Sequence, residues 1–237
     1  MSELFDIACN FSSNRYDNDL DEVIKHAKNN NVTKFLVVSA SINDVNKVYS
    51  IYQKYRSDCF FTVGTHPHHA NEINSESMKK MRILVKDLKP CSVGETGLDF
   101  FRNLSTLEEQ IFAFEEQIKL SIEFNKPLFL HQRDAHDEFI KIIMKYKNDI
   151  NKAVVHCFTG TQKQLDSYLN LGFYIGLTGW ICDERRNVEL RKSIKNIPLD
   201  KLMIETDSPY LIPRNLDIKP KNNRNEPSYL PHIAKEI

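Results

Sequence analysis

The fold of this 237-residue chain is decided by one stretch, in which CSVGE (91–95) and PLFLH (127–131) flank LEEQIFAFEEQIKLSIEFN (107–125). In the middle segment, apolar residues recur every three or four positions, at Ile111, Phe114, Ile118 and Ile122. This spacing predicts an amphipathic helix. The flanking runs are almost continuously apolar, as in parallel strands that are covered on both faces. The stretch therefore predicts a strand, a helix and a second, parallel strand.

The same alternation extends over the whole chain. Runs rich in β-branched and aromatic residues predict eight strands, at 4–9, 34–40, 59–64, 91–95, 127–131, 153–158, 173–179 and 202–207. Helical spacing predicts seven helices, at 17–30, 43–56, 75–87, 107–125, 134–148, 162–171 and 187–197. This α/β pattern is typical of a closed (β/α)8 TIM barrel. An open, doubly wound sheet is the alternative, but the turn after the first strand, 10–13, has no glycine.

The bulk composition limits the class of protein. A length of 237 residues fits one barrel, so we predict a single domain over 1–237. Basic and acidic residues number 32 each, so the net charge does not indicate a polyanionic partner. Five cysteines without a CxxC pair predict free thiols in a reducing compartment. With no signal peptide and no apolar run of membrane-spanning length, we expect a cytoplasmic protein without a membrane partner; nuclear entry is left open.

Four predicted strands end in a side chain that can bind a metal ion. These side chains are Glu95, His131, His156 and Asp207. The C-terminal ends of barrel strands open on one face, so residues far apart in sequence are expected to converge there. Two imidazoles and two carboxylates suit Mg²⁺, Mn²⁺ or Zn²⁺. One such residue alone would be explained as a hydrogen-bonded rim residue, whereas four on separate strands predict a metal site.

A histidine-rich turn, GTHPHH (64–69), follows the third predicted strand. His66 lies nearest the strand end, and we expect it in the barrel mouth, where it would orient substrate or transfer a proton near neutral pH. We place His68 beside it as a substrate-binding residue. For His69 a solvated loop position is the simpler interpretation.

Basic and aromatic residues also cluster after the predicted strand ends. The basic ones are Arg102, Arg133, Arg185, Arg186, Arg214, Lys219, Lys221 and Arg224, and the aromatic ones are Phe100, Phe101, Trp180 and Tyr210. Guanidinium groups suit phosphate oxygens and aromatic faces suit unstacked bases, although solvated rim charge is the alternative. We select Arg133 and Arg185 as substrate-binding residues. The motifs GxxxxGK[ST], GxGxxG and GxSxG are absent, so neither a nucleotide cofactor nor a serine nucleophile is predicted.

Five ordered motifs together resemble the TatD family of metal-dependent deoxyribonucleases. They are VGETGLDF (93–100), LHQRDAH (130–136), VHCFTGT (155–161), GLTGW (176–180) and IETDSPYL (204–211). The resemblance implies a TIM barrel of the amidohydrolase superfamily that hydrolyses DNA phosphodiesters as a 3′–5′ exonuclease on single strands, with RNA as a second candidate substrate. It implies Mg²⁺, with Mn²⁺ or zinc as alternatives, on the four strand-end residues Glu95, His131, His156 and Asp207. Glu205 would support these ligands without binding the ion.

The resemblance is incomplete at the first strand and near the end of the chain. Ala8-Cys9-Asn10 stands where many members carry an HxH pair for a second ion, as in the TatD-like branch that lacks the pair. Asp6 or Asn10 could offer only a weak oxygen ligand, so we expect one firm metal site. The segment after Pro209 predicts a long loop, and the chain ends at Ile237, before the last helix that the resemblance implies.

Three hypotheses follow for the function. The leading one is a DNA phosphodiesterase, in which a bound ion polarises a phosphoryl oxygen and acidifies the attacking water, with Asp207 as general base. The second is a metal-dependent ester or amide hydrolase, such as a deacylase of aminoacylated RNA, because the same ligands would serve it. The third is a non-catalytic binding barrel, for which the missing HxH pair is the only support.

Overall fold

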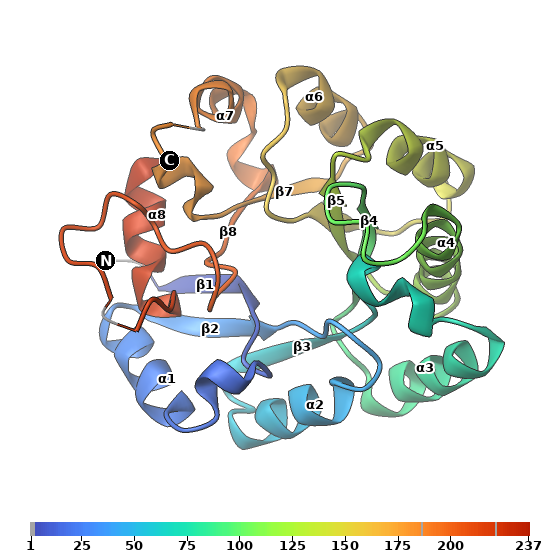
Figure 1. Cartoon of the computed structure of the whole chain (residues 1–237), viewed down its shortest axis with the longest axis horizontal. Helices are drawn as coiled ribbons and strands as arrows, with labels where there is room; N and C mark the ends of the chain where they lie inside the picture. Colours follow the sequence, from blue (N-terminus) through green and yellow to red (C-terminus); the bar gives the residue numbers. More distant parts are fainter. Residues whose placement is uncertain (1–2, 186, 221) are drawn as a thin grey trace.

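A computed structural model describes residues 3–185, 187–220 and 222–237. Eight parallel strands form one sheet in the order β1 to β8, and helices surround it on the outside (Figure 1). The strands are β1 (Leu4–Cys9), β2 (Val32–Val37), β3 (Cys59–Val63), β4 (Ser92–Asp99), β5 (Leu128–Arg133), β6 (Ala153–Val155), β7 (Tyr174–Leu177) and β8 (Leu202–Ile204). This sequential order confirms the predicted barrel, because a doubly wound sheet would reverse its order part-way.

The first and last strands meet at their C-terminal ends. Cys9 forms a parallel bridge with Ser208, and the backbone N–H of Asn10 donates to the Ser208 carbonyl over 2.8 Å. The seam of the barrel therefore lies next to Asp207, one of the predicted site residues.

All but the last of the described outer helices follow the predicted amphipathic segments. The outer helices are α1 (Leu20–Asn29), α2 (Val45–Lys54), α3 (Ser75–Leu88), α4 (Leu107–Glu123), α5 (His136–Tyr146), α6 (Gln162–Asn170), α7 (Val188–Ser193) and α8 (Leu230–Glu236). In α4, Phe114 and Ile118 are fully buried against the sheet, and Thr106 caps the helix in a capping box with Glu109. Short 3₁₀ helices are η1 (Asn14–Tyr16), η2 (Pro67–Glu72), η3 (Gly179–Cys182), η4 (Ile194–Asn196), η5 (Leu199–Lys201) and η6 (Pro227–Tyr229).

The hydrophobic core has two parts. The larger part packs between the sheet and the helices, as the burial of Phe35, Phe114 and Leu128 illustrates. The smaller part includes Ile7 and Phe129 and draws further side chains from β2, β6 and β8. Because these strands surround the barrel axis, this second cluster fills the barrel interior and supports the polar residues at its mouth.

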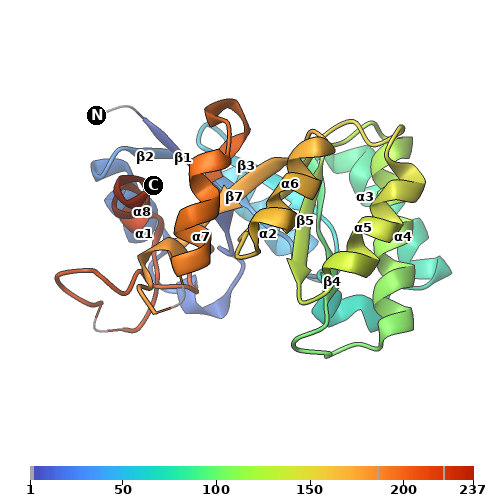
Figure 2. The ribbon, with the colours of Figure 1, turned by 90° about the horizontal axis from the view of Figure 1, so that it is seen from above.

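Two strands run further than the sequence predicts. We ended them at Glu95 and His131, but β4 and β5 stay paired as far as Asp99 and Arg133. Glycine is required at position 97 because a Cβ atom would lie 1.9 Å from the His131 carbonyl oxygen. Figure 2 shows β4 and β5 directed toward the same side of the barrel as the long segment between β8 and α8.

The C-terminal segment also differs from its prediction. We predicted a loop through Pro231, but helix α8 begins at Leu230, with Pro231 in its first turn. A proline is tolerated there because the first turn of a helix has no intrahelical partner for its N–H. Within the described parts of the chain, no helix has the length and hydropathy needed to cross a bilayer.

Candidate metal centre and active site

The predicted site residues lie at the C-terminal mouth of the barrel. Glu95 is on β4, His131 is on β5 and His156 directly follows β6. His66 follows β3, and Asp207 follows β8. The sheet topology therefore gathers residues from five strand ends at one face.

Three imidazole nitrogens surround one carboxylate oxygen, Oε1 of Glu95. The nearest is Nε2 of His156 at 2.7 Å, followed by Nδ1 of His131 at 3.0 Å and Nε2 of His66 at 3.3 Å. One candidate ligand atom from each of Glu95, His131 and His66 lies within 4.8 Å of the others. Mixed nitrogen and oxygen donors that converge on one buried point fit a small divalent ion.

The charges of this cluster depend on each other. Burial alone would raise the pKa of Glu95, but His156, His66 and His131 outweigh it, so that the pKa lies well below its usual range. Burial opposes a charged His156, yet Glu95 and Glu205 raise its pKa well above the ordinary value. The pKa of His131 is raised in the same way, by Asp99 and Glu95 against the effect of burial.

A second carboxylate stands behind each of two imidazoles. Asp99 Oδ2 is 3.2 Å from Nε2 of His131, which leaves Nδ1 of that ring to face the centre. Glu205 Oε1 is 3.5 Å from Nδ1 of His156, close enough for attraction although not aligned as a hydrogen bond. A carboxylate behind a ligating histidine fixes the ring and its tautomer, and it is typical of metal sites.

Asp99 is a site residue whose role the sequence analysis missed. It is 1% exposed and contacts both His131 and His68, whose Nε2 lies 2.8 Å from Asp99 Oδ2. Side chains alternate along a strand, so residues 95, 97 and 99 share one face. We could have found Asp99 by continuing the predicted strand beyond Glu95.

His66 differs from the other two imidazoles of the cluster. Its Nδ1 accepts the backbone N–H of His68 over 3.0 Å, so the proton of the neutral ring belongs on Nε2, facing the centre. Burial lowers the pKa of His66 to about 4, although Glu95 opposes the shift. The ring is therefore neutral at working pH and presents an N–H donor to the centre, which suits an anionic substrate oxygen.

Asp207 lies beside the cluster and makes no hydrogen bond to its described members. Asn10 Nδ2 donates to Asp207 Oδ1 over 2.9 Å. Burial raises the pKa of Asp207 to about 7, His156 opposes this shift, and the carboxylates of Glu95 and Glu205 add to it. A carboxylate that titrates near neutrality can accept a proton at working pH.

Asp6, considered above as an oxygen ligand on the first strand, is engaged in hydrogen bonds within the protein. Asp6 is fully buried and accepts hydrogen bonds from the backbone N–H groups of Thr206 at 2.9 Å and Ala8 at 3.2 Å. The Thr206 hydroxyl donates to its other oxygen. Asp6 therefore joins β1 to the segment after β8, and Asn10 is engaged with Asp207.

The basic residues of the prediction are dispersed. Arg133 places its guanidinium 3.8 Å from the centre of the Phe101 ring, at the barrel mouth. Arg185 pairs with Asp183 over 2.9 Å. Arg224 is buried between Asp19 and Glu226. Arg186 and Lys221 lie outside the described residues.

His69 lies outside the site. Its Nδ1 is 3.0 Å from Glu72 Oε1 on the exposed surface, in agreement with the simpler interpretation of a loop position.

The comparison with known proteins identifies the family. A family model described as TatD related DNase matches residues 5–237. The chain belongs to this family. It is 42% identical over 234 residues to a protein of Erwinia billingiae named 3′-5′ ssDNA/RNA exonuclease TatD, covering 99% of this chain and 90% of that protein. A protein of the same name from Cronobacter sakazakii is 43% identical, with coverage of 99% and 89%.

Solved structures of TatD proteins share the fold. A TatD family hydrolase of Entamoeba histolytica superposes with a TM-score of 0.89 at 28% identity, covering all of this chain and 91% of its own. A TatD homologue of Escherichia coli gives 0.89 at 25% identity, with coverage of 98% and 88%. Membership confirms the predicted family and makes the chain a metal-dependent hydrolase, which contradicts the hypothesis of a non-catalytic barrel.

Raising the pH from 6 to 8 should tighten Mn²⁺ binding. Ligands must lose their protons when a metal binds, and the pKa values of His131, His156 and Asp207 are raised in the metal-free protein, that of Asp207 to about 7. Below these pKa values protons compete with the ion for the ligands. For each proton that must leave, the metal affinity falls about tenfold with each unit by which the pH is lowered. Calorimetric titration in two buffers of different ionisation enthalpy would count the protons. Equal affinity at both pH values would contradict the prediction.

Proposed function

We propose that the protein is a metal-dependent 3′–5′ exonuclease acting on single-stranded DNA, with RNA as a second substrate. The observation that carries this proposal is the convergence of three imidazole nitrogens on Glu95 Oε1, within the residues that the family model matches. The names of the relatives at 42% and 43% identity support the substrate and the polarity. We also propose one domain over residues 1–237, because all eight strands form one sheet.

For the ion we propose the ligands Glu95, His131, His156 and Asp207. The carboxylates behind His131 and His156 support these two rings as ligands, whereas the Nε2–H of His66 supports a different role for that ring. Mg²⁺ is our first choice, with Mn²⁺ or Zn²⁺ as alternatives. When bound, the ion supplies positive charge that polarises a phosphoryl oxygen and acidifies a neighbouring water.

The other residues would position the phosphodiester and move the proton. Asp207 would accept the proton of the attacking water, since its buried carboxylate lies beside the proposed ligands Glu95 and His156. His66 would donate its Nε2–H to a phosphoryl oxygen, and Arg133 would neutralise phosphate charge at the mouth. His68, held by Asp99 and about one quarter exposed at its side chain, would contact the substrate next to His66.

We further propose a cytoplasmic location. All five cysteines are free, and three of them are buried, which supports a reducing compartment.

The decisive experiment is product analysis on labelled strands. Purified protein with Mg²⁺, Mn²⁺ or Zn²⁺ should shorten a 5′-labelled single strand stepwise from its 3′ end, and release single labelled nucleotides at once from a 3′-labelled strand. A matching duplex and an RNA strand define the substrate range. Cleavage no faster than that of an Asp207→Ala variant would reject the proposed nuclease.

Arg133→Gln should lower the affinity for a single strand more than Arg185→Gln does. It should also make that affinity less dependent on salt concentration. Arg133 makes no ion pair with any described residue, whereas Arg185 already pairs with Asp183 over 2.9 Å. One lost phosphate contact should reduce the slope of log affinity against log salt by about 0.7 for a single strand. Fluorescence anisotropy at several salt concentrations measures this slope. Equal slopes in the two variants would argue against Arg133, and a slope near zero in the unmodified enzyme would favour a small ester or amide substrate.

A further inference from the structure

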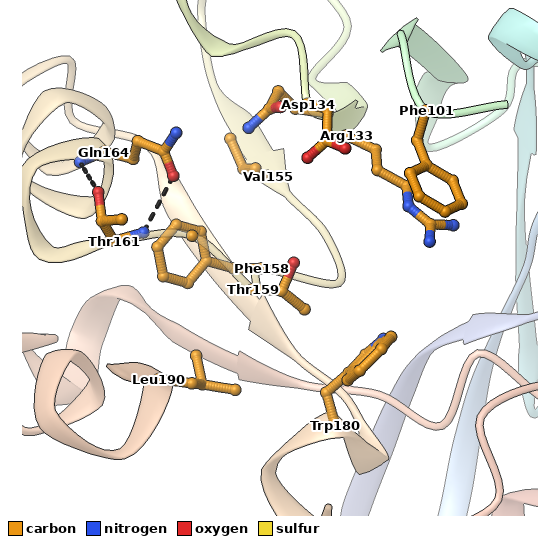
Figure 3. Close-up of a pocket in the computed structure, with 12 residues that line it drawn as sticks. Phe101, Arg133, Asp134, Val155, Phe158, Thr159, Thr161, Gln164, Trp180 and Leu190 are labelled. Atoms are coloured by element: carbon orange, nitrogen blue, oxygen red, sulfur yellow. Dashed lines mark hydrogen bonds between the residues drawn. The ribbon is translucent and has the colours of Figure 1, made fainter. Parts of the chain in front are cut away.

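A cavity of about 490 Å³ opens at the barrel mouth (Figure 3). Its walls come from the ends of β5 and β6, from the segments after β4, β5, β6 and β7, and from helices α6 and α7. Gln132 in its wall directly follows His131, and Phe158 comes two residues after His156. The cavity is therefore lined by close sequence neighbours of two imidazoles of the candidate metal centre. A strand with a phosphate at that centre would place a neighbouring nucleotide at the cavity.

Flat side chains lie on facing sides of this cavity. On one side the Arg133 guanidinium stacks on the Phe101 ring, 3.8 Å from its centre. Trp180 lines the facing side of the cavity in Figure 3. Aromatic faces and a stacked guanidinium bind the π-face of a base without regard to its sequence.

Polar groups are also available at the cavity. Thr159 and Asp134 line it, and their side chains make no hydrogen bond to any described residue. The neighbouring Gln132 is already used, because it donates to the Tyr168 hydroxyl over 2.9 Å and accepts the Ala135 N–H over 3.0 Å. A hydroxyl and a carboxylate can form hydrogen bonds with the edge of a base. These polar groups therefore favour a base over a purely apolar ligand.

The size of the cavity fits one nucleotide, and among the described residues its wall carries one cation, Arg133, and one anion, Asp134. Its volume falls within the roughly 300–1,000 Å³ range of small-ligand pockets. Arg133 supplies positive charge beside the stacking faces, which complements the phosphate attached to the base.

We propose that this cavity, the stacking cavity, binds one unpaired base of the nucleic-acid strand between Trp180 and the Arg133–Phe101 pair. This inference rests on the proposed nuclease function and deepens it. A base in a duplex must leave its stack and its partner before it can enter such a cavity. The stacking cavity thus selects single strands at the nucleotide next to the cleaved bond.

Tryptophan fluorescence tests the contact directly, because Trp180 is the single tryptophan of the chain. The probe is a short oligothymidylate with phosphorothioate linkages, titrated into the enzyme with Mg²⁺ present while anisotropy of a labelled end records binding. We expect quenching of the Trp180 emission by the single strand and much less by the matching duplex. A strand that binds by anisotropy and leaves the emission unchanged would overturn the proposal.

Kinetics on abasic strands gives a second, independent test. Trp180→Ala should reduce kcat/KM on an intact strand by roughly 5- to 150-fold, the range for one lost base–aromatic stack, and Trp180→Phe should restore most of it. An abasic nucleotide is placed in turn at each of the last three positions of the strand. At one of these positions it should lower kcat/KM of the unmodified enzyme by a similar factor. On that strand Trp180→Ala should cause no further loss. Equal losses on both strands would mean a structural role and reject the stacking cavity.

A matched control is available for the other side of the cavity. Phe101 is 57% exposed at the stacking cavity, and Phe112 on α4 is 44% exposed but does not line it. Phe101→Ala should lower kcat/KM on the intact strand, whereas Phe112→Ala should not. If the unmodified enzyme cleaves no single strand, the proposed function fails; if it cleaves and these variants match it, only the stacking cavity fails.

Discussion

Glu95→Gln should lower metal affinity by more than about 100-fold and reduce kcat/KM on single-stranded DNA accordingly. Oε1 of Glu95 is the point on which His156, His131 and His66 converge, and an amide keeps its shape but removes its charge. Substitutions one layer behind a metal already cost about 10- to 100-fold, so the loss of a charged ligand should exceed that range. Calorimetric Mn²⁺ titration and activity across Mn²⁺ concentrations measure the effect.

Asp99→Asn is the matched control for this variant. It removes a buried carboxylate that contacts His131 but leaves every proposed ligand in place. Its metal affinity should fall by only about 10- to 100-fold, and excess Mn²⁺ should restore its activity. Circular dichroism would verify that both variants fold. A Glu95→Gln enzyme with metal affinity within tenfold of the original would refute the central position of Glu95.

Asp207→Asn should reduce kcat by about 10²- to 10⁴-fold, the usual contribution of a general base. The substituted amide can still accept the hydrogen bond from Asn10, so the local geometry is retained. The carboxylate has a pKa raised to about 7 in the metal-free protein, and it must be deprotonated to accept a proton. The measurement is single-turnover cleavage with saturating Mn²⁺, combined with metal analysis of the variant.

Asn10→Ala distinguishes the role of the Asp207 carboxylate from that of the hydrogen bond that holds it. This variant removes the hydrogen bond to Asp207 Oδ1 but keeps the proton acceptor, so we expect kcat to fall by about tenfold. A kcat for Asp207→Asn equal to that of Asn10→Ala would show that Asp207 positions groups rather than accepting a proton.

The barrel could be predicted from the sequence because its signal is repeated. Eight apolar strand runs alternate with amphipathic helices such as Leu107–Glu123, and each unit independently points to the same parallel topology. Strand ends carried the site for the same reason. Once strands are parallel, Glu95, His131 and His156 must emerge on one face, whatever their separation in sequence.

The errors arose where long-range contacts decide the structure. We ended the strand at Glu95, yet β4 continues to Asp99 with its backbone at Gly97 close to His131, and the role of Asp99 was therefore missed. Asp6 resembled a weak ligand, but its partner Thr206 is 200 residues away. The ion pair of Arg224 could not be predicted either, since its partner Asp19 lies 205 positions away. Periodicity and local motifs contain no information on such pairs.

The seam between β1 and β8 has a consequence for synthesis in the cell. Asp207 stands next to the bridge between Cys9 and Ser208, and its hydrogen-bond donor, Asn10, comes from the opposite side of that seam. During translation β1 emerges first and its neighbour β2 follows at once, whereas β8 and the bridging residue Ser208 on the other side of the seam are made nearly 200 residues later. A ribosome-bound, unfinished chain therefore lacks the Asn10–Asp207 pair. If Asp207 accepts the proton as proposed, we expect such a chain to be inactive toward the messenger RNA that encodes it.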